Sequence, residues 1–205
     1  MRRIFLILFT VLCTLAAQAQ DKALLSGIEK ANATVKSLEA HFVQTKTLKA
    51  KKTSVKSEGP IYLQGADKMA MVYQKPSTDN LTINGSQFFM QRGKKKSLFN
   101  TTKNKMMRSL SNTLLYCVHG KVQTLAAENK AKLTTAQTAD GIKVTLKTEK
   151  KSARGYSKIV LVYHPTTKLL TRMQMDEFNG NSTLYQISGI KKNASVNAKV
   201  FEIKK

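Results

Sequence analysis

The chain has 205 residues, 41% of them hydrophobic, and it carries 35 Lys and Arg against 12 Asp and Glu, a formal net charge of +23. This length and apolar content are enough for one domain with its own core, and they exclude a chain that is disordered throughout. The charge favours attraction to anionic partners, but it does not specify a fold.

The first 19 residues have the pattern of a secretory signal peptide. Two arginines near the start precede an apolar run over residues 4–15, and Ala17-Gln18-Ala19 gives the small-x-small cleavage pattern. The apolar run is too short for a comfortable membrane span. We therefore expect residues 1–19 to be a signal peptide cleaved after Ala19, and residues 20–205 to be a single exported domain.

The two cysteines support the same interpretation. Cys13 follows Leu12, where a bacterial lipobox requires a small residue, so we expect no lipid anchor. Cleavage leaves Cys117 alone, and a domain without an internal disulfide must be held by its core. Removal of the two leader arginines leaves 33 basic and 12 acidic residues, a mature charge of 33 − 12 = +21.

The mature chain begins with a predicted amphipathic helix and continues with strands. Apolar residues recur at helical spacing over residues 21–38. Four segments with period-two alternation follow, at residues 37–44, 59–63, 68–73 and 81–90. Residues 46–56 contain five lysines and few large apolar residues, so we expect a long solvated connection there.

A change of period marks residues 103–118, where apolar residues fit a helical stripe and Gly120 lies just past the end. We predict that this helix is a lid over the sheet, formed by Met106, Met107, Leu110 and Leu114.

From residue 132 onward period two returns in further short segments, the last of them a strand predicted at 197–203. About ten or eleven antiparallel strands at this spacing indicate a sandwich or barrel.

The sequence offers no catalytic or metal-binding constellation that we can assemble. The three histidines lie apart, at His41, His119 and His164. Cys117 and His119 are two residues apart, and such residues do not face each other on a helix. Paired carboxylates stay an open alternative, because a sequence does not show which side chains meet in space. We expect a protein that is not an enzyme and has no metal or cofactor.

The positive charge comes mainly from lysines that cluster in the connections between strands, away from the aromatic residues. Single-strand binders interleave basic and stacking residues, and base readers favour Arg, Asn and Gln. We therefore expect no nucleic-acid partner, and consider transient contact with an anionic membrane surface. A basic envelope protein that binds polyanions or a partner protein is the alternative from another functional class.

The methionine and aromatic faces of the predicted strands give the sharpest hypothesis. Successive side chains on a strand point to opposite faces, so these residues line one wide apolar wall. Methionine adapts to acyl chains of varying shape. The ordinary alternative is a solid barrel core. The predicted cavity residues are Phe42, Tyr62, Met69, Met71, Tyr73, Leu81, Ile83, Phe88, Met90, Ile159, Leu161, Met173 and Met175.

Several of these segments, in order, resemble the periplasmic outer-membrane lipoprotein carrier (LolA) family. The matching segments cover nearly the whole mature chain, and each motif is weak alone. They are Ser37-Leu38-Glu39-Ala40-His41-Phe42-Val43-Gln44, Ile61-Tyr62-Leu63 after Gly59, Tyr73-Gln74-Lys75-Pro76, Leu81-Thr82-Ile83-Asn84-Gly85-Ser86-Gln87-Phe88-Phe89, Tyr185-Gln186-Ile187, Asn193, Val196-Asn197 and Phe201.

The resemblance implies a mainly β, α+β fold: an incomplete antiparallel barrel with an N-terminal helix and a helical lid over an apolar cavity. It also implies a carrier of acylated lipoproteins from an inner-membrane donor to an outer-membrane acceptor, and we expect a monomer. The family's Arg-Pro pair after the second strand corresponds here to Gly65 and Ala66, so its lid latch is not carried over. A carrier of another lipid or amphiphile is the alternative within the family.

Overall fold

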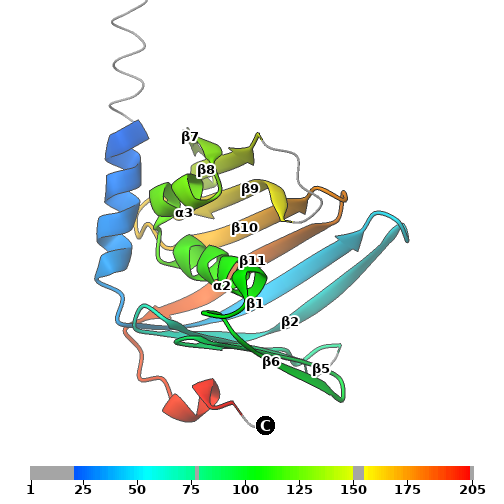
Figure 1. The fold of residues 1–205 in the computed structure, drawn as a ribbon. Coiled ribbons are helices and arrows are strands. Elements are labelled where there is room, and N and C mark those ends of the chain that lie inside the picture. The colour runs from blue at the N-terminus through cyan, green and yellow to red at the C-terminus, as the bar shows by residue number, and fades with distance from the viewer. Residues whose placement is uncertain (1–20, 77–78, 150–154, 204–205) are drawn as a thin grey trace, which may run out of the picture.

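The computed structural model describes residues 21–76, 79–149 and 155–203 (Figure 1). The predicted signal peptide lies outside the described residues. Residues 21–33 are helical, and Leu25 and Ile28 bury the apolar stripe of this helix in the core. Within the described part of the chain, no helix has the length and apolar character needed to cross a membrane.

Eleven strands form one antiparallel sheet in the described residues. Their bounds are β1 Ser37–Leu48, β2 Thr53–Gln64, β3 Lys68–Val72, β4 Asn80–Asn84, β5 Gln87–Arg92, β6 Lys95–Asn100, β7 Ala131–Thr138, β8 Gly141–Thr148, β9 Tyr156–Tyr163, β10 Leu170–Glu177 and β11 Ser182–Lys192.

The sheet order is β6-β5-β4-β3-β2-β1-β11-β10-β9-β8-β7, so β1 pairs with β11 and joins two meanders. The edge strands β6 and β7 are not paired with each other, which leaves the barrel open. The predicted incomplete barrel of ten or eleven strands is confirmed.

Helix α2 (Lys105–Val118) lies across the concave side of this curved sheet (Figure 1). It begins where the Asn104 side chain accepts a hydrogen bond from the backbone N–H of Met107 at 3.0 Å. Beyond its end, Gly120 has φ +68°, and a Cβ there would lie 2.7 Å from Ile28 Cγ2. Glycine therefore permits both the helix end and the close approach of the N-terminal helix. The predicted helix over 103–118 is confirmed.

Three predictions about secondary structure were wrong or incomplete. Residues 197–203 form no strand: Ala198–Phe201 is a 3₁₀ helix, η1, which contacts β3 and β4. Helix α3 (Val122–Glu128) was not predicted. The lysine-rich stretch 46–56 is mostly strand, because β1 and β2 extend as a long hairpin and leave only a four-residue turn.

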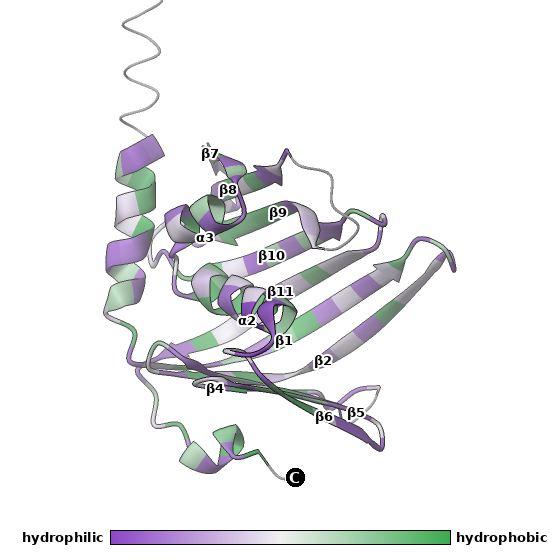
Figure 2. Ribbon diagram, viewed as in Figure 1, coloured by the Kyte–Doolittle hydropathy of each residue, from purple (hydrophilic) through white to green (hydrophobic). Residues whose placement is uncertain are grey.

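Side chains alternate between the two faces of the sheet, and Figure 2 shows apolar and polar bands alternating along β1 and β2. On the concave face, Ile61 pairs with Met71 and Leu63 pairs with Met69. On the convex face η1 buries Phe201, whose side chain is 2% exposed and whose carbonyl accepts a hydrogen bond from Asn84 at 3.3 Å. The core and the helix α2 therefore share the concave side.

Candidate functional site

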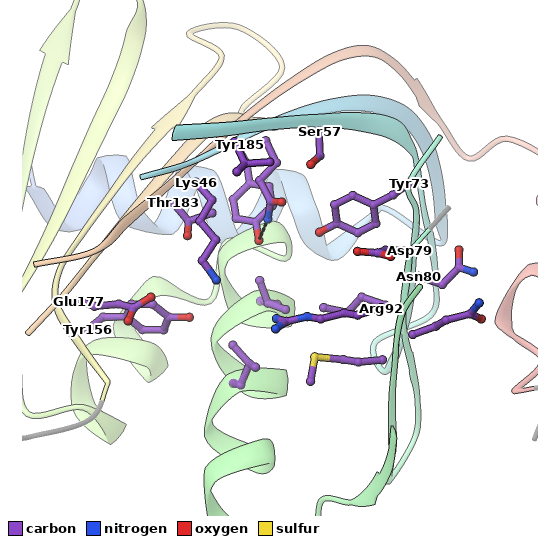
Figure 3. A pocket seen from close by; sticks show the side chains of 17 residues that line it. Lys46, Ser57, Tyr73, Asp79, Asn80, Arg92, Tyr156, Glu177, Thr183 and Tyr185 are labelled. Atoms are coloured by element: carbon purple, nitrogen blue, oxygen red, sulfur yellow. Dashed lines mark hydrogen bonds between the residues drawn. The ribbon is translucent and has the colours of Figure 1, made fainter. Parts of the chain in front are cut away.

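A cavity of about 440 Å³ lies between α2 and the open end of the curved sheet; we call it the mouth cavity (Figure 3). Strands from both meanders and the β3–β4 connection contribute to its wall. Its apolar and aromatic lining residues are Val55, Tyr73, Leu81, Met90, Leu110, Leu114, Tyr156 and Tyr185. Its polar and charged lining residues are Gln44, Lys46, Ser57, Asp79, Asn80, Gln91, Arg92, Glu177 and Thr183.

A second, deeper void contains only about 10 Å³. A single water needs about 10–15 Å³ of such space, so this region is packed core. We call it the packed end. Its lining is entirely apolar apart from one tyrosine: Phe42, Ile61, Met69, Met71, Leu114, Val118, Met173, Tyr185 and Ile187.

The predicted cavity residues divide between these regions. Tyr73, Leu81 and Met90 line the mouth cavity. Another four, Phe42, Met69, Met71 and Met173, line the void at the packed end. A further five are buried in the core without lining either space: Ile83, Phe88, Ile159, Leu161 and Met175. Lipid contact by any of them stays a prediction.

The placement of Tyr62 in the cavity was wrong. Tyr62 pairs with Glu39 and Ala70 on the convex face, whereas its neighbours Ile61 and Leu63 point to the concave face. A shift of one residue reverses the face of a strand side chain, and the aromatic character of Tyr62 does not reveal its face.

The predicted lid residues also divide. Leu110 and Leu114 line the mouth cavity, and Leu114 borders the packed end as well. Met107 is 7% exposed and packs in the core without lining either space. Met106 is 52% exposed, so its place in the apolar face of the lid was wrong.

Sequence reasoning missed several lining residues, which the alternation of β1 and β11 could have revealed. Gln44 and Lys46 follow Phe42 at intervals of two and therefore share its face. Opposite them on β11, Tyr185 pairs with Gln44, and the Gln44 amide donates a hydrogen bond to the Tyr185 hydroxyl at 2.7 Å. Tyr73 packs edge-on against Phe42, with ring centroids 4.9 Å apart, at the border between the two regions.

The tyrosines of the mouth cavity are neutral. Burial raises the pKa of Tyr73, Tyr156 and Tyr185 above the ordinary value for tyrosine. Their hydroxyl groups therefore act as neutral hydrogen-bond partners at the cavity wall.

Charged residues stand at the mouth of the cavity. Of the two carboxylates, Asp79 accepts a hydrogen bond from the Gly93 N–H at 2.8 Å, and Glu177 accepts one from the Asn179 amide at 2.9 Å. Lys46 and Arg92 are the cationic lining residues. The site therefore combines an apolar wall, neutral polar groups and charges near the solvent.

Cys117 and His119 do not form a reactive pair. Burial raises the pKa of the Cys117 thiol, which keeps it protonated, and this residue is fully buried. The Tyr163 hydroxyl donates a hydrogen bond to the Cys117 carbonyl at 2.7 Å, which ties α2 to β9. Across the described ranges, no group of three or more His, Cys, Asp or Glu is arranged to hold a metal ion.

Comparisons with solved structures place the fold among known ones. A DUF1329 family protein from Desulfovibrio piger is similar with a TM-score of 0.52 and 12% identity, covering 88% of this chain and 95% of the other. MucB has a TM-score of 0.50 and 13% identity, with 91% of this chain and 63% of MucB covered. A LolA superfamily protein from Nitrosomonas europaea has a TM-score of 0.44 and 10% identity, with 89% and 97% covered.

Curated protein sequences contain no match to this chain. The profile of the outer membrane lipoprotein carrier protein LolA family, however, matches residues 33–204, which include every strand and helix that lines the mouth cavity. The chain therefore belongs to the LolA family of outer membrane lipoprotein carrier proteins.

Proposed function

We propose that this protein is an exported periplasmic carrier that shields the acyl chains of lipoproteins in the mouth cavity and carries them toward the outer membrane. The observation that supports this proposal most directly is the cavity of about 440 Å³ between α2 and the open sheet. Ligand sites of about 300–1,000 Å³ with mostly apolar walls are typical of small-molecule binding. Membership of the LolA family supports the same function.

The energetics of such a site favour acyl chains. Each buried methylene contributes about 0.8 kcal/mol before ordering costs. Tyr73, Leu81 and Met90 offer the apolar wall on one side, and Leu110 of α2 offers it on the other. Since the packed end has no room for a ligand, an acyl chain enters the mouth cavity from the open end.

Helix α2 is held more firmly at one end than at the other, which suits a lid. Near the C-terminus of α2, the Cys117 carbonyl accepts a hydrogen bond from the Tyr163 hydroxyl. The Tyr116 hydroxyl donates a hydrogen bond to the Glu128 carboxylate of α3 at 3.0 Å. Its first residues carry the exposed Met106. We expect the N-terminal half to move when cargo enters or leaves, because most of the buried residues of α2 lie in its C-terminal half.

Release requires no energy-coupling motif within the protein. Competition for the acyl chain by an outer-membrane acceptor, or closure of α2 into the space, is sufficient to expel it. The donor in the inner membrane and the acceptor in the outer membrane are proteins that this mechanism requires.

A carrier of another lipid or amphiphile is the second candidate, and the mixed polar and apolar wall of the mouth cavity favours considering it. Mass spectrometry of lipids that co-purify with the periplasmic protein separates the two. Acylated lipoprotein in the sample supports the first candidate, and free lipid without lipoprotein supports the second.

The basic surface supports a transient contact with anionic membranes. The β1–β2 hairpin tip carries Lys49, Lys51 and Lys52, and the β5–β6 tip carries Lys94, at the open end of the sheet (Figure 1). Lysines near a membrane surface contribute about 1 kcal/mol each. If instead the protein functions by binding polyanions, its binding weakens steeply with salt, whereas acyl-chain burial does not.

Leu110→Asp tests the carrier function most directly. Because Leu110 lines the mouth cavity and is only partly buried, a carboxylate there makes the acyl site polar without opening the core. We expect fluorescent fatty-acid binding to weaken at least about tenfold, since a charge is strongly unfavourable in an apolar site. Met106→Asp is the matched control, because Met106 lies on the same helix but is exposed to solvent. Unchanged binding by the Leu110 variant contradicts the proposed site.

A further inference from the structure

The mouth cavity carries two cationic side chains that have no anionic partner among the described residues. We propose that Lys46 and Arg92 form a head-group site, so that the preferred cargo is a lipid with an anionic head group, a carboxylate or a phosphate. This inference rests on the second candidate of the proposed carrier function, a carrier of a lipid or amphiphile, and specifies the class of ligand.

The strand register puts both cations at the outer end of the apolar wall. Lys46 follows Phe42 on the concave face of β1, and Arg92 follows Met90 at the end of β5. Figure 3 shows both side chains reaching into the cavity from different walls. A ligand whose tail lies against Met90 would therefore have its head group near both cations.

Neither cation has a hydrogen bond or an ion pair through its side chain with another described residue. Ion pairs formed elsewhere in the described chain, such as Lys158 with Asp176 at 3.0 Å and Lys75 with Glu58 at 3.1 Å, show that lysines do find partners where carboxylates are close. Lys46 and Arg92 thus retain free donors, which bind anions more strongly than neutral groups.

The two carboxylates that line the same cavity do not neutralise these cations by direct contact. The Asp79 carboxylate accepts a hydrogen bond from the Gly93 N–H, and the Glu177 carboxylate accepts one from the Asn179 side-chain amide. Neither carboxylate forms an ion pair with Lys46 or Arg92 in the described residues. The mature charge of 33 − 12 = +21 adds an attractive field for an anion.

Neutral donors complete the site. The Tyr73 and Tyr185 hydroxyls lie in the cavity wall and stay protonated, so they add no negative charge that would repel an anionic head group. An anion would therefore meet two cations and two hydroxyl groups at the outer limit of an apolar wall.

The experiment compares ligands with the same twelve-carbon tail on the mature protein. Dodecanoate and dodecyl phosphate carry an anionic head, dodecanol carries a neutral one, and inorganic phosphate carries no tail. Calorimetry at physiological salt measures their affinities for the parent protein and for the double variant Lys46→Gln, Arg92→Gln. The control is Lys30→Gln, Lys143→Gln, which removes the same charge from two exposed positions outside the cavity lining.

We expect the parent and the control to bind the anionic ligands about tenfold more tightly than dodecanol, and the cavity variant to lose that preference while keeping dodecanol binding. Equal affinity for dodecanol and dodecanoate in the parent overturns the head-group site and leaves the carrier function intact. Inorganic phosphate binding as tightly as dodecyl phosphate assigns the site to a free anion and overturns a lipid cargo. Absence of binding to every twelve-carbon ligand contradicts the carrier function, and the head-group site with it.

Discussion

The two ends of the concave face are built from the same strands but differ in what they can hold. At the packed end, Met71 and Met173 lie around the same small void as Leu114 and Val118 of α2, and this void has a volume of only about 10 Å³. At the open end, about 440 Å³ stays accessible beside the same helix. The packed end therefore supplies stability, and the open end supplies the space for a ligand.

The difference originates in residue type along single strands. On β1 the concave positions change from Phe42 to Gln44 and Lys46, and on β11 they change from Ile187 to Tyr185 and Thr183. Polar side chains cannot interdigitate in a dry core without hydrogen-bond partners, so the sheet remains open where they occur. One continuous sheet thus contains both a core and a binding site.

We expect the largest difference between the two ends in the free energy of unfolding. Met71→Ala truncates a methionine at the packed end, and Met90→Ala truncates one at the open end. Met71 is 2% exposed, so its loss creates a cavity and should lower the free energy of unfolding by about 2–5 kcal/mol. Met90 is partly buried at the mouth cavity, where its loss should cost less than about 1 kcal/mol.

Urea unfolding monitored by circular dichroism measures both values. The Met90 variant should instead change fatty-acid affinity, because it alters the wall of the ligand space. Equal losses of stability in the two variants would show that the open end is as tightly packed as the other, contrary to the comparison.

Much of the sheet was predictable because period-two alternation is a local signal. It predicted ten or eleven strands and the inward positions of Met69 and Met71, and helical spacing predicted α2. It failed at residues 197–203, where Asn197 caps a 3₁₀ turn through a hydrogen bond to the Lys199 N–H at 3.0 Å. A short apolar pattern cannot distinguish such a turn from a strand.

The site itself was predicted less well, for a physical reason. Apolar character predicts burial, but a buried side chain fills space as readily as it lines it. Ile83 and Leu161 were therefore predicted as cavity residues, although they pack in the core. The residues that mark the cavity, Gln44, Lys46 and Arg92, are polar, so apolar character does not reveal them. Only the register of distant strands brings Arg92 of β5 to the two residues of β1.

A smaller effect is expected at the border between the two ends, where Tyr185 lines both spaces. Tyr185→Phe removes the acceptor of the 2.7 Å hydrogen bond from Gln44 and should cost about 1 kcal/mol in the free energy of unfolding. Tyr156→Phe is the matched control, since the Tyr156 hydroxyl lines the mouth cavity without a hydrogen bond to any described residue. Chemical denaturation measures the free energy of unfolding of both variants. An equal decrease in the two would show that the hydrogen bond between Gln44 and Tyr185 adds no stability of its own.

The smallest effect concerns pH and the C-terminal end of α2. Burial, and secondarily the neighbouring Lys121, lowers the pKa of His119, whose Nε2 is buried without a hydrogen-bond partner in the described residues. In the unfolded chain the imidazole protonates at its ordinary pKa of about 6.5. Below that pH the unfolded state binds more protons than the folded state, so the free energy of unfolding should fall as the pH falls through this window and be fully retained above it.

His119→Gln should flatten this decline, because the amide does not titrate; urea unfolding between pH 7.5 and 5.5 compares it with the parent. An identical slope in both proteins would exclude His119 as the cause. The described lining of the mouth cavity includes no histidine, whereas His119 follows α2 at the end tied to β9 and α3. Mild acid should therefore destabilise the C-terminal end of α2. It should leave the preference of the mouth cavity for an anionic head group unchanged, so that the stability of the packed end and ligand recognition at the open end respond separately to pH.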